Sequence, residues 1–179
     1  VGDDIVVSKT AGLEGTAILA YDQGEILEEY FGPAFVEKAR SYIDFISVAK
    51  EGRIAAEFGA NAMHDATEGG VLGALWEMGQ AINKGILVYK ENIPIAEETK
   101  AISKLLNINP LRLISSGTMV IISPVGKKLV EELKKNNIDS AVIGNIIDEK
   151  GVWMIEDGIR KPVDPPGSDE LYKAIENSK

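Results

Sequence analysis

The spacing of apolar positions divides the chain into short strand-like runs and longer helical ones. Short runs rich in Val and Ile, closed by Gly, Pro or polar residues, are typical of buried strands. Apolar residues three or four positions apart, such as Val71, Leu75 and Met78, are typical of one helix face. The runs predict strands over residues 5–8, 61–64, 85–89, 117–123, 141–146 and 152–155. The helical spacing predicts helices over residues 13–21, 33–42, 48–58, 69–83, 96–106 and 127–136, and one after residues 165–167 that Ser168 caps.

The order of these elements favours one α+β domain over residues 1–179. The strand at 152–155 is followed by Asp157-Gly158, a dipeptide typical of a tight hairpin, which turns the chain back towards Ile159. Most other strands are separated by helices and require crossovers. The expected fold is therefore a mixed β-sheet flanked by helices.

Composition and charge narrow the possible functions. The 179 residues include 28 acidic and 19 basic side chains, a formal net charge of −9, and no Cys. The acidic balance argues against nucleic-acid binding, which relies on Lys and Arg to neutralise phosphates. Because there is no Cys and His64 is the only histidine, disulfides and thiol catalysis are excluded, and zinc and iron–sulfur sites nearly so.

Two features of the sequence bear on where the protein is located in the cell. No stretch approaches the roughly 18–20 continuous apolar residues of a membrane span. Residues 1–4 lack the basic segment and apolar segment of a signal peptide. We therefore expect a cytoplasmic protein with no membrane partner. Because the chain starts at Val1 and a strand-like run begins at once, we also expect it to be part of a longer protein.

Residues 63–72 carry the clearest candidate chemistry. They place a strand end, a polar turn and the pair Gly69 and Gly70 directly before the most strongly periodic helix. Unpaired N–H groups at a helix start bind phosphate favourably, and glycine lets a ligand approach the main chain. Asp65 or Glu68 offers a carboxylate to Mg²⁺, and Thr67 offers a hydroxyl. Asp65, Thr67, Gly69 and Gly70 form the predicted phosphate site. Of the two carboxylates, Asp65 is the predicted metal ligand.

A plainer interpretation of the same segment remains open. Asp65 and Glu68 have the three-residue spacing of a capping box, and Thr67 is an equally good helix cap. In that case these side chains serve the helix and bind no ligand. His64, beside an apolar strand, is interpreted as a structural residue rather than a catalyst.

A second polar loop, over residues 8–15, joins a predicted strand to a predicted helix. Gly12 and Gly15 interrupt it, a layout that can hold phosphate. The Gly-Lys-Ser/Thr ending of a P-loop is missing, so an ordinary strand-to-helix turn is the alternative. Residues 115–118 likewise either offer hydroxyls to a ligand or form a plain loop.

Taken in order, these segments resemble the C-terminal domain of the AIR synthase-related family. The family includes AIR synthase, selenophosphate synthetase, thiamine-monophosphate kinase and the hydrogenase-maturation protein HypE, and the resemblance is nearest to HypE-like members. Residues 64–71 are similar to the family signature Asp-Pro-Thr-(Arg/Glu)-Gly-Gly-Leu. The other segments that match in order are residues 2–8, 93–95, 109–111, 116–120 and 141–144.

The resemblance implies an enzyme that uses ATP and Mg²⁺ to activate a carbonyl or amide oxygen by phosphorylation. It implies an N-terminal ATP-binding domain, absent from these residues, through which the full-length protein forms a homodimer. The substrate is then a small molecule or a group on a carrier protein. HypE-like members are expected to convert an S-carboxamide on their own C-terminal cysteine into a thiocyanate. The resemblance identifies no general base, so the catalytic residues stay unknown.

The sequence departs from the family pattern at three points. It contains no Cys, Ala66 replaces the signature proline, and Ser116 replaces an acidic residue usual in HypE. These residues alone therefore cannot perform the HypE reaction, and we expect little or no catalysis by the isolated domain. Two alternatives stay open: a non-catalytic binding or assembly module with the same fold, and another family activity such as a small-metabolite kinase.

Overall fold

The computed structural model describes residues 1–177. Among these residues, seven strands form one sheet in the order β2-β4-β1-β5-β3-β6-β7. Strands β3 and β6 pair in parallel and the other neighbours are antiparallel, which confirms the predicted mixed sheet. The strands are β1 (Asp4–Ser8), β2 (Ala62–Ala66), β3 (Gly85–Tyr89), β4 (Thr118–Ser123), β5 (Ser140–Ile147), β6 (Gly151–Glu156) and β7 (Ile159–Pro162).

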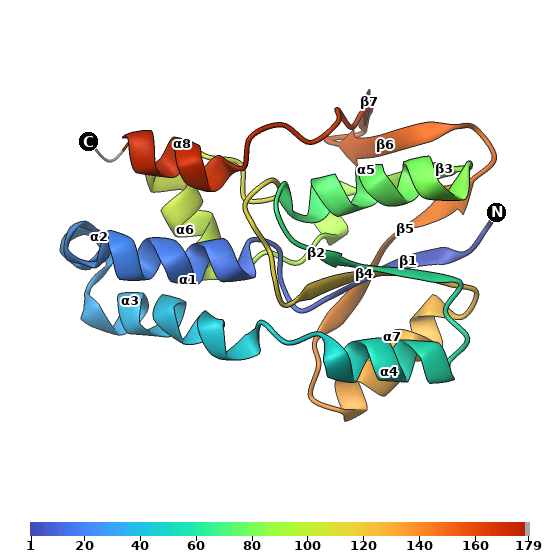
Figure 1. Cartoon of the computed structure of the whole chain (residues 1–179), viewed down its shortest axis with the longest axis horizontal. Helices are drawn as coiled ribbons and strands as arrows, with labels where there is room; N and C mark the ends of the chain where they lie inside the picture. The colour runs from blue at the N-terminus through green and yellow to red at the C-terminus, as the bar shows by residue number, and fades with distance from the viewer. Residues whose placement is uncertain (178–179) are drawn as a thin grey trace.

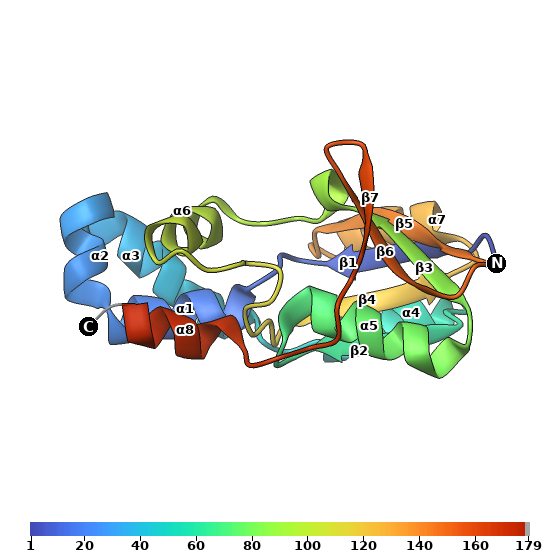
Figure 2. The same cartoon turned by 90° about the horizontal axis from the view of Figure 1, so that it is seen from above.

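Helices cover both faces of the sheet and extend beyond one end of it. Helix α5 lies on one face and helices α4 and α7 on the other, while the remaining helices gather beside the sheet (Figure 1). Seen from above, the molecule has a helical half and a sheet half (Figure 2). The helices are α1 (Leu13–Asp22), α2 (Gly24–Phe31), α3 (Pro33–Arg40), α4 (Ala49–Glu57), α5 (Gly70–Ile82), α6 (Glu97–Leu105), α7 (Gly126–Lys135) and α8 (Glu170–Asn177), with short 3-10 turns η1 (Ser41–Phe45) and η2 (Lys90–Asn92).

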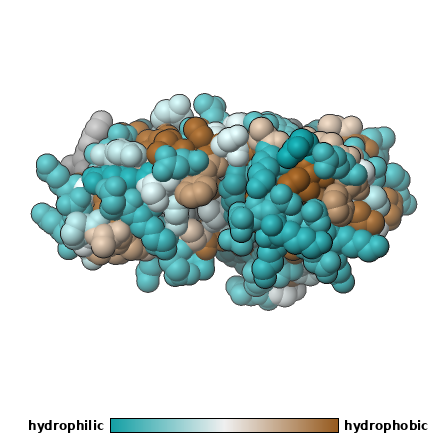
Figure 3. Space-filling view, turned by 90° about the horizontal axis from the view of Figure 1, so that it is seen from below, coloured by the Kyte–Doolittle hydropathy of each residue, from teal (hydrophilic) through white to brown (hydrophobic). Residues whose placement is uncertain are grey.

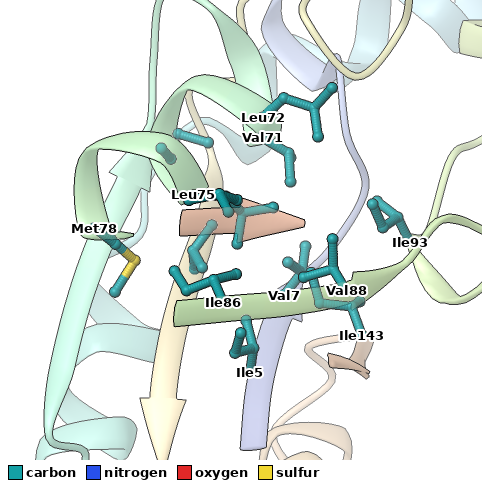
Figure 4. Close-up of a cluster of buried hydrophobic side chains, with 14 of the residues drawn as sticks. Ile5, Val7, Val71, Leu72, Leu75, Met78, Ile86, Val88, Ile93 and Ile143 are labelled. Carbon is teal, nitrogen blue, oxygen red and sulfur yellow. The ribbon is translucent and has the colours of Figure 1, made fainter. Parts of the chain in front are cut away.

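Strand β1 is buried on both faces because helices cover both sides of the sheet centre. Ile5 and Val7 point into the cluster under α5, whereas Val6 points into the cluster under α4 and α7. Alternation of this kind follows from the two-residue period of a strand. Figure 4 shows the first cluster, in which Leu75 of α5 faces the sheet residues.

The helical half has its own core. Leu19, Leu27 and Ile102 are buried there, on α1, α2 and α6 respectively. Leu113 joins the same core from the segment that precedes β4. This segment therefore connects the core of the helical half to the start of β4.

Two local expectations were wrong. The sequence predicts no element over residues 24–31, yet α2 forms there, held by the buried Leu27. Three Glu residues interrupt the apolar positions of this run, so the sequence pattern favours a solvated charged face there. Ser168 is exposed and is not the cap of the last helix. Asp169 takes that position, because its Oδ1 accepts the N–H of Leu171 at 2.8 Å.

Candidate functional site

Three polar segments meet at one edge of the sheet. Antiparallel pairing of β4 with both β1 and β2 brings the ends of β1 and β2 to the start of β4. The segments that follow or precede these strands, residues 9–15, 64–70 and 115–118, are therefore neighbours, and we call them the three-loop edge. The Ser115 N–H donates to the Thr67 carbonyl at 3.3 Å, and the Thr118 hydroxyl donates to the Thr10 carbonyl at 2.6 Å.

The glycines of the first loop serve packing. The Gly12 N–H donates to the Ser115 hydroxyl, and the Gly15 N–H donates to the Ile114 carbonyl at 2.9 Å. A Cβ on Gly15 would lie 2.4 Å from the Leu113 side chain, so only glycine fits. Both amides are engaged within the chain, and phosphate binding by Gly12 and Gly15 stays a prediction that lacks geometric support.

The start of α5 is closed by a carboxylate of the chain itself. Asp169 is 5% exposed, and its Oδ2 accepts the Gly69 N–H at 2.8 Å while Oδ1 accepts the Ile114 N–H at 3.2 Å. The Gly70 N–H donates to the Thr67 carbonyl at 3.1 Å. Asp169 thus occupies the place at the helix start that favours an anion. A phosphate can reach the Gly69 amide only after Asp169 leaves it.

The bond pattern at Asp169 makes a prediction about stability. We expect Asp169→Ala to lower the free energy of unfolding by about 2–4 kcal/mol, because hydrogen bonds to charged groups contribute about 1.5–3 kcal/mol each and buried N–H groups are left unpaired. Urea unfolding of the chain measures the loss. Ser168→Ala is the matched control and should change stability by less than about 0.5 kcal/mol. Equal losses for the two variants would contradict the capping role of Asp169.

The second loop leaves three side chains exposed at the three-loop edge, those of Asp65, Thr67 and Glu68. No side-chain cap bond forms at α5, so the capping-box alternative is wrong. Among residues 1–177, the Thr67 hydroxyl and the Glu68 carboxylate have no hydrogen-bond partner, and Asp65 contacts only the His64 ring, at 3.7 Å. These groups are therefore free to contact a ligand.

His64 is held on both sides of its ring. Its Nε2 lies 2.7 Å from Glu77 Oε2 and its Nδ1 lies 2.7 Å from the Asp65 carbonyl. The Nε2 contact fixes β2 to α5, whereas the Nδ1 contact holds the ring against its own strand. This agrees with the structural interpretation of His64.

Sequence reasoning missed the residue that organises the edge. Lys9 has a left-handed φ of 53°, and its ammonium donates to the Ser47, Gly117 and Phe45 carbonyls at 2.8, 2.8 and 3.1 Å. The same ammonium pairs with the buried carboxylate of Glu51. No sequence signal links residues so far apart. Because every donor of Lys9 is used, its role is to position loops rather than to bind phosphate.

A second buried carboxylate fixes η1. Glu98 accepts hydrogen bonds from Lys38 Nζ at 2.7 Å and from the Tyr42 hydroxyl. Burial opposes ionisation of Glu98, but the bonds from Lys38 and Tyr42 outweigh it, so the pKa of Glu98 is lowered. Burial, together with the Glu98 carboxylate, raises the pKa of Tyr42. The ionised Glu98 therefore anchors η1, which carries the Phe45 carbonyl to Lys9.

The chain offers an incomplete set of metal ligands. In residues 1–177, no three His, Asp or Glu side chains lie close enough together to hold a metal ion. Mg²⁺ commonly takes one or two protein carboxylates together with substrate phosphates. Asp65 has an exposed carboxylate, and its role as a metal ligand stays a prediction.

The geometry defines a domain that presents loops at a strand-end edge rather than a closed pocket. Residues 1–155 match the model of the AIR synthase related protein family, C-terminal domain, and the chain belongs to that family. This confirms the resemblance carried by the sequence. None of the helices within residues 1–177 is long and apolar enough to cross a membrane.

The curated relatives are hydrogenase-maturation proteins. A putative hydrogenase expression/formation protein of Methanocaldococcus jannaschii is 31% identical over 175 residues, which cover 95% of this chain and 50% of the relative. The carbamoyl dehydratase HypE of Bradyrhizobium diazoefficiens is 32% identical over 124 residues, 68% of this chain and 33% of the relative. The chain thus spans half or less of these two relatives.

Solved structures share the fold. The crystal structure of Escherichia coli HypE has a TM-score of 0.75 at 21% identity, over 97% of this chain and 52% of that one. The structure of HypE in complex with ATP has a TM-score of 0.71 at 20% identity, and the match covers 97% of this chain and 52% of that one. A chain of a HypE–HypF complex has a TM-score of 0.69 at 24% identity, and the match covers 92% of this chain and 53% of that one. At these identities the likeness shows the fold alone.

Proposed function

We propose that this chain is the C-terminal half of a HypE-like enzyme that uses ATP to phosphorylate a carbonyl or amide oxygen. The observation that carries the proposal is the pair of exposed side chains of Asp65 and Thr67 on the three-loop edge, neither of which caps α5. Support comes from the family match, from a relative named carbamoyl dehydratase and from a HypE structure that holds ATP. We also propose that residues 1–179 form one domain.

In this proposal the edge faces a nucleotide held mainly by the other half of the protein. Phosphorylating an oxygen turns it into a good leaving group, and such catalysis depends on positioning and charge neutralisation. Asp65 would hold Mg²⁺ beside the phosphates, and Thr67 would donate its hydroxyl to a phosphate oxygen. Lys9 and Asp169 would not contact the nucleotide themselves. Their role is to fix the loops that carry Asp65 and Thr67.

The substrate and assembly follow from the same proposal. The chain contains no Cys, so a thiol that carries the reacting group must come from outside these residues. We propose a small molecule or a carrier protein as substrate, a homodimer of the full-length protein, and a cytoplasmic location. A protein partner agrees with the solved HypE–HypF complex of similar fold.

The proposal is tested by turnover in the full-length protein. We expect Asp65→Ala to lower the rate of ATP-dependent turnover at least about tenfold, since removing one charge-stabilising group costs several kcal/mol of barrier in comparable sites. Glu57→Ala, which removes an exposed carboxylate on α4, is the control and should keep the wild-type rate. Wild-type turnover by a folded Asp65→Ala protein would overturn the proposal.

Two observations favour a second candidate, a non-catalytic binding or assembly module. The Gly69 amide before α5 is closed by Asp169, and the cysteine of the HypE reaction is missing from these residues. A module of this kind would keep the fold and contact a partner protein. It predicts that the full-length protein binds no Mg²⁺-ATP.

A further inference from the structure

The end of the helical half exposes large apolar side chains on a short ordered segment. Residues 21–30, where α1 ends and α2 follows, form what we call the helical tip. Tyr21, Ile26 and Tyr30 are 58%, 41% and 65% exposed. Such residues cost free energy when they face water, and a gathering of them marks an interaction surface. In the view from below, the surface of the helical half is mainly hydrophilic, with separate apolar areas (Figure 3).

A cavity of about 500 Å³ opens at this tip. It is lined by the six residues from Tyr21 to Ile26, together with Arg40 of α3. The Arg40 guanidinium lies against the main chain, because a Cβ on Gly24 would be 2.1 Å from Nη2. Arg40 also donates through Nε to the Ala20 carbonyl at 3.1 Å and lies 5.7 Å from the Tyr21 ring centre. Arg40 is thus part of the wall.

The rim of the cavity is acidic. Residues 21–30 contain four carboxylates and neither Lys nor Arg, and all four are exposed: Asp22, Glu25, Glu28 and Glu29. Arg40 offsets only one of these four charges, and its Nη1 lies 3.5 Å from Glu28 Oε1 and 3.7 Å from Glu37 Oε2. Apolar anchors inside an acidic rim match a basic, apolar partner.

The tip is a rigid part of the molecule. Leu27 is fully buried in the core of the helical half, and Phe31 stacks on Phe35 with ring centres 4.6 Å apart. The backbone that carries the exposed side chains is therefore anchored in the core before any partner binds. Little backbone ordering cost then opposes docking.

We propose that the helical tip docks a basic amphipathic segment of a partner protein. Lys or Arg side chains of the partner would enter the cavity and face Asp22 and Glu25, while its apolar side chains cover Tyr21, Ile26 and Tyr30. A second copy of this chain fits poorly, because a two-fold contact places the acidic rim against itself. An anionic lipid surface or a nucleic acid is repelled for the same reason. This surface is separate from the three-loop edge and does not depend on ATP chemistry.

The probe for this surface is a synthetic helical peptide of Lys and Leu with all Leu on one face. Two peptides serve as controls: one with Ser in place of Leu, and one with Glu in place of Lys. Binding to the labelled full-length protein is followed by fluorescence anisotropy, and the contacted residues by NMR shifts. We expect binding of the Lys/Leu peptide alone, with shifts confined to residues 20–31 and Arg40.

Matched variants make the result decisive. The triple variant Tyr21→Ser, Ile26→Ser, Tyr30→Ser should weaken binding about tenfold or more, as loss of interface anchors does. The pair Glu25→Lys, Glu29→Lys changes no apolar residue and should also weaken it. Tyr89→Ser with Ile159→Ser, exposed apolar residues elsewhere, should not. Circular dichroism confirms that each variant is folded.

Three outcomes would overturn the proposal. If the Lys/Ser peptide bound as tightly as the Lys/Leu peptide, charge attraction alone would explain the binding. Equal weakening by the Tyr89 and Ile159 variant would remove the specificity for the tip. A dimer in sedimentation that the triple variant abolishes would show that a second copy covers the tip.

Discussion

Lys9→Met is expected to lower the free energy of unfolding by about 3–5 kcal/mol, because breaking a buried ion pair leaves the other charge uncompensated. Glu51 is 1% exposed, so its carboxylate would remain in the core without its cation. The carbonyls of Ser47 and Gly117 would also lose their donor. Met is the substitution of choice because it is unbranched like Lys and only one atom shorter, and it carries no charge. Urea unfolding of the chain measures the loss.

The same pair supplies the control. Adding Glu51→Gln to Lys9→Met removes the stranded charge, so the double variant should lose less stability than the sum of the two single variants. If Lys9→Met lowered the free energy of unfolding by less than about 1 kcal/mol, this ion pair would contribute no more than an exposed surface pair does. That result would contradict the organising role given to Lys9.

Gly70→Ala is the second variant with a large expected effect. Gly70 has a φ of +63°, and a Cβ there would lie 2.6 Å from the Leu111 carbonyl oxygen and 2.7 Å from the Leu113 carbonyl oxygen. The left-handed conformation costs an alanine about 1–2 kcal/mol, and overpacking costs about 1–3 kcal/mol more. We therefore expect a total loss of about 2–5 kcal/mol in thermal or urea unfolding.

Gly59→Ala separates the two contributions. Gly59 has a similar φ of +72°, but a Cβ there meets nothing within 4 Å. Its loss should be confined to the conformational part, about 1–2 kcal/mol. If both variants lost the same amount, the close approach of residues 111–113 to the start of α5 would not be what requires glycine at position 70.

Most elements of the fold follow from periodicity alone. Strand β1 and helix α5 have strong apolar patterns, and both form where the sequence predicts them. Helix α2 escapes prediction because its stability comes from packing of Leu27 against other helices, which no local pattern encodes. Local spacing predicts Ser168 as the cap of the last helix, because it cannot show that Asp169 also reaches the distant Gly69 amide.

The candidate site was only partly predictable. The loops around Gly12 and Gly69 do converge, as a sheet edge shared by β1, β2 and β4 requires. The glycines themselves were predicted to cradle phosphate, whereas the structure uses their amides internally. The groups that accept these amide hydrogens belong to Ser115 and Asp169, which lie roughly 100 residues along the chain from Gly12 and Gly69. Long-range contacts of this kind cannot be detected from a local sequence pattern.

The central claim is that Asp65 and Thr67 form part of a nucleotide site in the full-length protein, and titration calorimetry with Mg²⁺-ATP tests it most directly. The wild type should release binding heat at one saturable site. Asp65→Ala should weaken the affinity about tenfold, with Thr67→Val weakening it less and Glu57→Ala leaving it unchanged, as loss of charge-assisted and neutral contacts implies. Unchanged heat and affinity in folded Asp65→Ala protein, or no binding heat from the wild type, would contradict the account.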